Sequence, residues 1–392
     1  MKGAVILGAC RTAGGSFGGS LKALEAVDLG AAVIREAVKR AGIDPAHVGE
    51  LVMGNGWQAG NGPNPARIAG WRSEALKDVP AFTVNMRCGS GLLAVALGAD
   101  KVRLGSADAV VSGGMESASR VPYILPDARW GHTMGEKAVP DLLHRDGFQC
   151  PLSGMLMGRT AEILASEYGI SREEQDAYSA ESHRRAVEAI DGGAFKKEIL
   201  PVEVRVKKET ILFDTDEIPR RDTGIDKLAR LPSIFMENGT VTAGSSSALC
   251  DAGSAVVVAG SEWAGAEGLA PLAEILSYSL ATVPPDHMGM GPVPAIKNAL
   301  DQAGLSLGDI DLFEINEAFA VQVLAVQREL RFPLDRCNIH GGAIALGHPI
   351  GATGAKILTT LLHSLEERGK EIGCAAACIG GGQGVAMIVR RL

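Results

Sequence analysis

Two cysteines and a histidine, each set among glycines, are the residues of this sequence best suited to chemistry. Cys88 lies in RCGSG, His348 in GGAIALGHPIGATGA and Cys378 in CIGGGQG. A thiol becomes a nucleophile when it loses its proton, and an imidazole can take that proton at neutral pH. Glycines let a second backbone approach such a pair closely. The combination indicates sulfur chemistry on a thioester.

Cys88 opens the run CGSGLLAVALGADKVRLG, whose apolar spacing predicts a helix that begins just after the cysteine. A thiol at a helix N-terminus has its thiolate stabilised by the helix dipole and by free amides, so we expect its pKa to be lowered. The alternative is an inert buried cysteine, because free cysteine is among the most buried residue types.

His348 precedes a proline, which constrains its backbone, and it can serve either as the base for a thiol or as a structural histidine in a glycine loop. Cys378 ends the strand-like run CAAAC, and the glycines after it leave N–H groups free to face an oxyanion. Cys374 is expected on the same face of that strand, as core. Two strand residues four apart hold their thiols about 13 Å apart, so a metal site is not favoured.

The run NEAFA at 316–320 follows the strand-like LFEI and begins a predicted helix. Asn316 can cap that helix or orient a water molecule. Glu317 would be a buried carboxylate that needs partners.

An internal repeat indicates the elements that position these residues. The segment 37–55 is followed 262 residues later by a similar segment at 299–317, and both read as amphipathic helix, Ala-Gly stop, short loop and apolar strand. The same offset carries Gly89, beside Cys88, onto Gly351, just after His348. Two similar α/β halves explain this pattern, although helix–loop–strand units also recur by chance.

Between about 120 and 240 the sequence changes to loops rich in proline and aromatic residues, with a helix that begins at a capping signature at Ser171. We interpret this region as a loop domain inserted into the first half, of a size that often covers a ligand. The predicted domains are therefore 1–120 plus 249–270, the inserted domain 121–248, and the second half 271–392.

Composition restricts the class of protein further. The 392 residues carry a net charge of -8, which argues against a nucleic-acid partner. The seven cysteines are scattered without a CxxC pair, so we expect free thiols rather than disulfides or a bound metal. No apolar run is long enough to span a membrane, and the early apolar run resembles a buried strand rather than a signal peptide. A cytoplasmic location is expected.

Five motifs taken together, RCGSG, GGMES, NEAFA, GGAIALGHPIGATGA and CIGGGQG, closely resemble the thiolase family in order and spacing. The resemblance runs the whole length and includes NPAR at 64–67 and TAG at 242–244. It implies an α/β fold of two duplicated βαβαβαββ halves in a five-layer α/β/α/β/α arrangement, with the inserted loop domain over a coenzyme A site.

The resemblance also implies roles. Cys88 would take the acyl group as a thioester, His348 would activate its thiol, and Cys378 would move the proton at the α-carbon of the second acyl-CoA. Asn316 would hold a water that forms one oxyanion site with His348, and the backbone amides of Cys88 and Gly380 would form the other. The residues implied for coenzyme A and the acyl channel are Arg220, Ser247, Met157, Phe235, Met288 and Phe319.

Three positions depart from the family pattern. They are Leu156, Ser245 and Cys250, and they bear on pocket polarity and chain-length preference rather than on the catalytic set. Arg221 beside Arg220 leaves the assignment of the nucleotide-binding arginine open.

The activity implied is reversible cleavage of acetoacetyl-CoA by coenzyme A, or condensation of two acetyl-CoA, with no cofactor because coenzyme A is itself substrate or product. The alternatives are a broader 3-oxoacyl-CoA thiolase of fatty-acid β-oxidation, a non-catalytic acyl-CoA-binding relative, and a cysteine hydrolase. The resemblance further implies a homodimer or a homotetramer assembled through a loop at 122–143. Apolar residues of that loop, Tyr123, Ile124, Leu125 and Trp130, would otherwise be exposed or would pack on their own domain.

Overall fold

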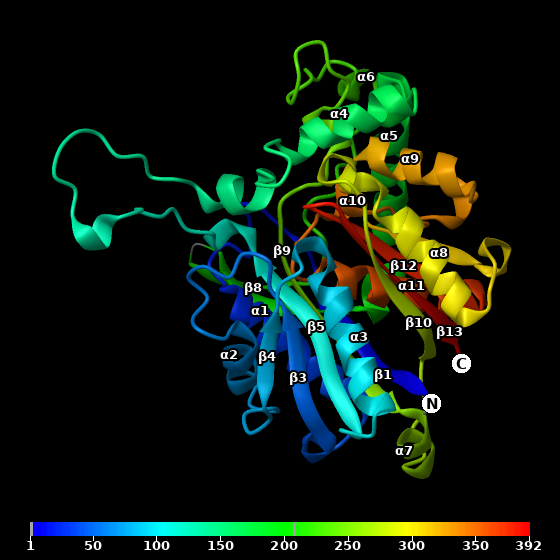
Figure 1. Ribbon diagram of the computed structural model, residues 1–392. Helices are drawn as coiled ribbons and strands as arrows, with labels where there is room; N and C mark the ends of the chain where they lie inside the picture. Colours follow the sequence, from blue (N-terminus) through cyan, green and yellow to red (C-terminus); the bar gives the residue numbers. More distant parts are fainter. Residues whose placement is uncertain (1–2, 207) are drawn as a thin grey trace.

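Two half-sheets meet edge to edge at the centre of the protein. The computed structural model describes residues 3–206 and 208–392, and its main sheet runs in the order β11-β12-β13-β10-β1-β9-β5-β3-β4 (Figure 1). Strands β1 (Ala4–Thr12) and β10 (Ala273–Thr282) are paired through Val5 with Glu274 and Ile6 with Ala273. This short pairing marks the junction between the halves.

Both halves have the same strand order when read outward from that junction. After β1 come β9, β5 and β3, and after β10 come β13, β12 and β11. The pairs β5–β3 and β12–β11 are parallel, whereas the inner pairs are antiparallel. Strand β4 extends the first half alone. The strand bounds are β3 (Val48–Gly54), β4 (Ala81–Val84), β5 (Ala109–Ser117), β9 (Cys250–Gly260), β11 (Leu312–Ile315), β12 (Ile372–Ile379) and β13 (Gln383–Arg391), with short β2 (Gly15–Ser16) on β9 and β6 (Ile199–Leu200) on β1.

Helices form three layers around the half-sheets. Helices α3 (Ser90–Arg103) and α11 (Thr353–Arg368) pack against each other between the half-sheets. The outer face of the first half is covered by α1 (Ala26–Ala41) and α2 (Pro65–Arg72), and that of the second by α8 (Pro292–Ala303) and α9 (Ala320–Leu330). Because successive strand residues point to opposite faces, Val256 and Val258 face the central helices while Val257 faces α1. The predicted five-layer fold is confirmed.

The repeat seen in the sequence corresponds to equivalent elements of the two halves. Helix α1 leads into β3 as α8 leads into β11, and each helix ends at a left-handed glycine, Gly42 with φ 66° and Gly304 with φ 67°. Only glycine adopts this conformation without a steric cost, which is why both copies carry the Ala-Gly stop. The interpretation of the repeat as a chance match is therefore wrong.

Between β5 and β9 the chain forms a long segment whose helices are drawn at the top of Figure 1, and within it β6 pairs with β1 of the main sheet. Its helices are α4 (Met157–Glu167), α5 (Arg172–Gly192) and α6 (Ile225–Leu228), and its hairpin is β7 (Val202–Val206) with β8 (Glu209–Phe213). The predicted start of α5 is confirmed by a capping box, in which Ser171 and Glu174 each bind the other's backbone N–H. The exact domain boundaries stay a prediction.

The loop at 122–143 projects away from the body of the protein, at the left of Figure 1. Its Tyr123 and Trp130 side chains are 64% and 83% exposed. Packing of these two residues onto their own domain, one of the two sequence interpretations, is therefore wrong. Short helices α7 (Ser261–Ala266) and α10 (Ala343–Leu346) complete the fold. Among the described residues, no helix is both long and apolar enough to cross a membrane.

Candidate active site

Cys88 and His348 come from different halves and meet between the half-sheets. Cys88 lies in a 3₁₀ turn (Arg87–Gly89) directly before α3, and His348 lies in the loop between α10 and α11. The Nε2 atom of His348 is 3.1 Å from the sulfur of Cys88. Both side chains are buried, with 9% and 8% exposed. The two structural alternatives, an inert cysteine and an isolated histidine, do not fit this pairing.

Thr353, a residue that the sequence reasoning missed, fixes the orientation of the imidazole. Its hydroxyl donates to the Pro349 carbonyl at 3.0 Å and lies 2.6 Å from Nδ1 of His348. Because the hydroxyl hydrogen points to Pro349, the Thr353 oxygen is left to accept the hydrogen of Nδ1. Nε2 then carries a free lone pair facing the Cys88 thiol, which is the tautomer that a base requires.

The pKa of Cys88 is raised rather than lowered, so the expectation of a helix-activated thiolate is wrong. Burial is the dominant cause, and it outweighs the Arg87 charge and the amides of Gly380 and Cys88 itself, which lower the pKa. Burial also lowers the pKa of His348 to about 3, with the charges of Lys356 and Arg87 acting in the same direction. The resting pair is therefore a neutral thiol beside a neutral base.

Cys378 occupies the end of β12, next to the turn that carries Cys88. Burial raises the pKa of the Cys378 thiol, and the charge of a Cys88 thiolate would raise it further. Its side chain, with that of Cys374, belongs to the core on the outer face of the second half, whereas Cys88 belongs to the central core. The amides of Gly380 and of Cys88 itself lower the pKa of the Cys88 thiol, so two backbone donors lie near its sulfur.

Asn316 is not a helix cap, because α9 begins after Phe319. Its side chain is buried, and neither Oδ1 nor Nδ2 has a hydrogen-bond partner within the described residues. A buried unpaired amide costs about 1–3 kcal/mol, so a water or ligand group bound to Asn316 would recover hydrogen bonds that the protein alone leaves unmade. Neighbouring Glu317 does have its partners: Tyr178, Ser182, Asn338 and the Ile344 amide all donate to its carboxylate.

Glu116, in the motif GGMES on β5, binds the loop that carries His348. Its carboxylate accepts hydrogen bonds from Asn55 Nδ2 at 2.7 Å and from the amides of Gly56 and Gly351, both at 2.8 Å. The loop lies so close to β5 that a Cβ atom at Gly114 would collide with the Gly351 carbonyl. Sequence reasoning quoted the motif but did not single out its carboxylate, because the donors come from distant segments.

Four of the residues predicted for the acyl and pantetheine channel lie together. Met157, Met288 and Phe319 are buried in one cluster, and Phe235 packs against it with its ring edge-on to Phe319 at 6.0 Å between centroids. A Cβ atom at Gly380 would lie 2.8 Å from Met157 Cε, so this cluster borders the catalytic residues. The structure thus places apolar surface beside the Cys88 centre.

The two other residues predicted to contact coenzyme A, Ser247 and Arg220, differ in how they relate to this apolar cluster. The Ser247 amide donates to the Ala318 carbonyl at 3.0 Å, which ties the Ser247 segment to the turn before Phe319. Arg220 is exposed, and its backbone N–H donates to His183. No contact in the described residues joins Arg220 to the apolar cluster. Arg221 forms a two-armed ion pair with Asp191, so of the two adjacent arginines Arg220 is the one whose guanidinium makes no such pair.

Two of the three departures from the family pattern, Ser245 and Cys250, have local explanations in the structure. Ser245 closes a capping box with Thr242, whose amide donates to Ser245 Oγ at 2.9 Å. Cys250 is fully buried, and a Cβ at Gly347 would lie 2.8 Å from its sulfur, so it packs beneath the residue before His348. Leu156 is half-buried before α4, and nothing in the structure explains its identity.

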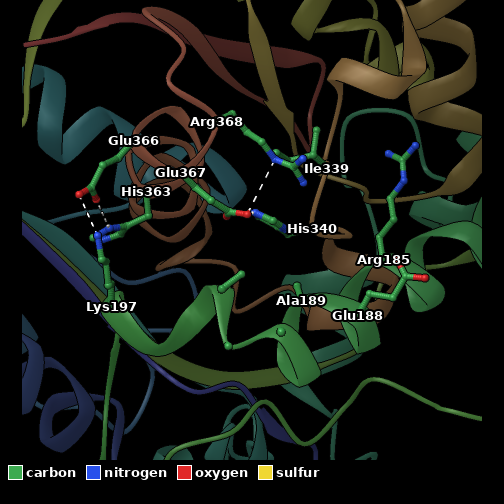
Figure 2. A pocket seen from close by; sticks show the side chains of 13 residues that line it. Arg185, Glu188, Ala189, Lys197, Ile339, His340, His363, Glu366, Glu367 and Arg368 are labelled. Carbon is green, nitrogen blue, oxygen red and sulfur yellow. Dashed lines mark hydrogen bonds and ion pairs between the residues drawn. The ribbon is translucent and has the colours of Figure 1, made fainter.

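A cavity of about 410 Å³ lies elsewhere, between the C-terminal ends of α5 and α11 (Figure 2). Its charged side chains pair with one another: Glu367 with His340 at 2.8 Å, and Glu366 with Lys197 at 2.8 Å. It contains none of the residues predicted for the site, and the Nε2 atom of His363 on its wall is buried without a hydrogen-bond partner in the described residues. Within the described part of the chain, no cluster of three or more His, Cys, Asp or Glu side chains is arranged to hold a metal ion.

The chain is similar to known proteins over its whole length. The family described as "Thiolase, N-terminal domain" matches residues 4–262, and "Thiolase, C-terminal domain" matches 269–391. The sequence is 52% identical over 393 residues to acetyl-CoA acetyltransferase of Escherichia coli K12 and 49% identical over 392 residues to that of Pseudomonas aeruginosa, with 100% of each chain covered. Two solved structures, Bacillus anthracis acetyl-CoA acetyltransferase and human mitochondrial 3-ketoacyl-CoA thiolase, match with TM-scores of 0.98 and 0.97 at 41% and 39% identity, covering 100% of this chain and 99% of each of theirs.

Proposed function

Because the chain belongs to the thiolase family, we propose that it transfers an acetyl group between thioesters of coenzyme A. In one direction coenzyme A cleaves acetoacetyl-CoA, and in the other two acetyl-CoA molecules condense. The observation that carries this proposal is the 3.1 Å contact between Cys88 Sγ and Nε2 of His348. The names of the relatives, acetyl-CoA acetyltransferases at 46–52% identity over nearly the full length, support the acetyl group as substrate.

In the cleavage direction, His348 takes the Cys88 proton as the sulfur attacks the 3-oxo carbonyl of acetoacetyl-CoA. The carbon–carbon bond then breaks, leaving acetyl-Cys88 and the enolate of acetyl-CoA, which takes a proton at its α-carbon from Cys378. Coenzyme A replaces this product and gives its thiol proton to the Cys378 thiolate. Its own thiolate then attacks acetyl-Cys88, and the departing Cys88 thiolate takes back its proton from His348. Covalent catalysis thus divides one difficult step into two, with ping-pong kinetics.

Negative charge develops on two oxygens during this sequence. We assign the oxygen of the acetyl-Cys88 adduct to the amides of Cys88 and Gly380, which already face the sulfur. The enolate oxygen is assigned to His348 together with a water held by the unpaired amide of Asn316. Preorganised donors of this kind contribute roughly 3 kcal/mol each to the transition state.

For coenzyme A itself, Met157, Met288, Phe235 and Phe319 supply the apolar channel, Ser247 the pantetheine contact and Arg220 the nucleotide contact. Coenzyme A enters and leaves as a reactant, and we expect no resident cofactor.

A chain-length series tests the substrate. Purified protein is incubated with coenzyme A and 3-oxoacyl-CoAs of increasing length, and thioester cleavage is followed. Faster cleavage of acetoacetyl-CoA than of longer chains is expected. Much slower cleavage of acetoacetyl-CoA would instead favour the broader thiolase of fatty-acid degradation.

The covalent step is tested with Cys88→Ala, which should abolish turnover. Full turnover by this variant would rule out the acyl-enzyme. Wild-type protein that binds acyl-CoA without transfer would fit the non-catalytic alternative, and sustained release of free acid would fit a hydrolase.

We also propose that the protein is a homotetramer, acting in the cytoplasm in fatty-acid metabolism. The tetramer is supported by the exposed apolar residues of the projecting 122–143 loop. Light scattering should show a smaller assembly when the loop is deleted, and an unchanged mass would count against the loop.

A further inference from the structure

Lys356 is a buried amine that the proposed mechanism does not use. It lies on α11, three residues after Thr353, so the two side chains share one face of the helix. Its Nζ donates to the Leu346 carbonyl at 2.6 Å and to the Gly347 carbonyl at 3.0 Å. These are the two carbonyls directly before His348.

Together, Lys356 and Thr353 bind every residue of the segment that presents the imidazole. Lys356 holds the carbonyls of residues 346 and 347, while Thr353 holds the Pro349 carbonyl and Nδ1 of His348. A fifth contact, from outside α11, is made by the His348 amide, which donates to the Ala248 carbonyl at 2.9 Å. The base is therefore positioned by one face of α11.

We propose that Lys356 is a positioning residue of the transfer reaction: by binding the carbonyls of Leu346 and Gly347 from α11, it fixes the backbone from which His348 reaches Cys88. This inference rests on the proposed function for its catalytic meaning, since it assigns a support to the base of that reaction. A base must lie within hydrogen-bond reach of its proton, and a displacement of about 1 Å costs as much as a hundredfold in rate.

The ammonium charge of Lys356 has a second effect, on the protonation of His348. The charged groups around the imidazole are Arg87 on the Cys88 turn and Lys356 on α11, and both lower the pKa of His348. Removal of the Lys356 charge therefore raises the pKa of His348, and the neutral base is lost at a higher pH.

Lys356 itself faces charged groups from several elements. Burial lowers its pKa, and the Arg11 charge acts in the same direction, whereas Asp216, Glu198 and the Cys250 thiol raise it. The two carboxylates are the partners that favour the ammonium form in this buried position, although each of them also binds Arg11.

Three variants separate the two effects of Lys356, its hydrogen bonds to the backbone carbonyls and its positive charge. Lys356→Met keeps the chain length but removes both, Lys356→Gln keeps a donor without charge, and Lys356→Arg keeps both. Lys297→Met, at an exposed lysine of α8 paired with Glu329, is the matched control. Each protein is treated with short pulses of iodoacetamide over a pH range that extends below the His348 pKa of about 3, and alkylation of Cys88 is followed by mass spectrometry, alongside kcat and KM for acetoacetyl-CoA.

We expect Lys356→Met to slow Cys88 alkylation and to lower kcat by about tenfold or more, with KM within about twofold of the wild-type value. In this variant, the acidic limb of the plot of Cys88 alkylation rate against pH should move to higher pH. Lys356→Gln should show the same shift with a smaller loss of rate, and Lys356→Arg and Lys297→Met should resemble wild type.

A folded Lys356→Met protein with the wild-type rate and pH profile would overturn the inference. If that variant does not fold, a Lys356→Gln protein with both the wild-type alkylation rate and an unshifted acidic limb overturns it instead. The two failures can be told apart because alkylation requires no acyl-CoA. Absence of transfer activity in the wild-type protein would contradict the proposed function. The alkylation profiles would still show whether Lys356 positions His348.

Discussion

The carboxylate of Glu116 accepts a hydrogen bond from the Gly351 amide at 2.8 Å, and this contact joins the end of a first-half strand to the second-half loop that carries His348. Glu116 is fully buried and also binds donors at Asn55, Gly56 and Trp57. The position of the loop that carries His348 therefore depends on the Glu116 carboxylate.

Glu116 makes the stability of the protein depend on pH. Burial raises its pKa from 4.5 to about 7, against the effect of its backbone donors. Between these values the folded protein holds a proton that the unfolded chain has released, so the stability contributed by this group is fully present below about pH 4.5 and is lost as the pH rises through 7. Between pH 5 and 8, we expect wild type to lose about 2 kcal/mol relative to Glu116→Gln, seen as a change of roughly 3 °C in their difference in Tm.

The control for this measurement is Glu274→Gln, which alters a partly exposed carboxylate paired with Arg390. Its difference in Tm from wild type should stay constant over the same range. A constant difference for Glu116→Gln as well would contradict the prediction.

Cys378→Ala should separate acylation from turnover. Cys88 and His348 remain paired in this variant, so acetylation of Cys88 by acetyl-CoA should stay within about threefold of the wild-type rate. The enolate loses its proton donor, so steady-state turnover should fall by about a hundredfold or more. Mass spectrometry of the intact protein in a single turnover, compared with kcat, measures both. Cys374→Ala, on the same strand face, should turn over normally.

Asn316→Ala should lower kcat by about a hundredfold while changing the free energy of unfolding by less than about 1 kcal/mol, because both polar atoms that it removes are buried without partners. Asn338→Ala is the contrasting variant, since its amide binds the backbone of Ile315 and the carboxylate of Glu317. It should lose about 2–3 kcal/mol. Denaturant unfolding and kcat for both variants check this, and equal destabilisation would show that Asn316 is only structural.

Thr353→Val should slow Cys88 acetylation by about tenfold or more, because Nδ1 of His348 loses its acceptor and the reactive tautomer is no longer favoured. Thr353→Ser keeps the hydroxyl and should react at a near-normal rate. Pre-steady-state acetylation of the two variants distinguishes the hydroxyl from the shape of the side chain. Equal acetylation rates in the two variants would show that the Thr353 hydroxyl does not set the tautomer of His348.

The fold was largely predictable because its signals are local or repeated. Apolar strands such as residues 254–260 are buried on both faces in β9, and the two Ala-Gly stops predicted equivalent helix ends. The catalytic set was identified by motifs in a fixed order, and the contact between Cys88 and His348 agrees with that expectation.

The supports of the site were not predictable in the same way. Glu116 and Lys356 act on backbone atoms far away in the sequence, and a backbone carbonyl or amide leaves no residue type to recognise. The pKa of Cys88 was mispredicted for a related reason. Helix position is visible in the sequence, whereas full burial, which outweighs it, emerges only when both halves pack around the thiol.

A side chain at Gly114 would collide with the Gly351 carbonyl, so this contact limits which first half can pack against which second half. Such a side chain on the first half would displace the second-half loop that carries His348. Chimaeras that exchange whole halves between relatives should fold into active proteins only when both sides of this contact come from compatible parents.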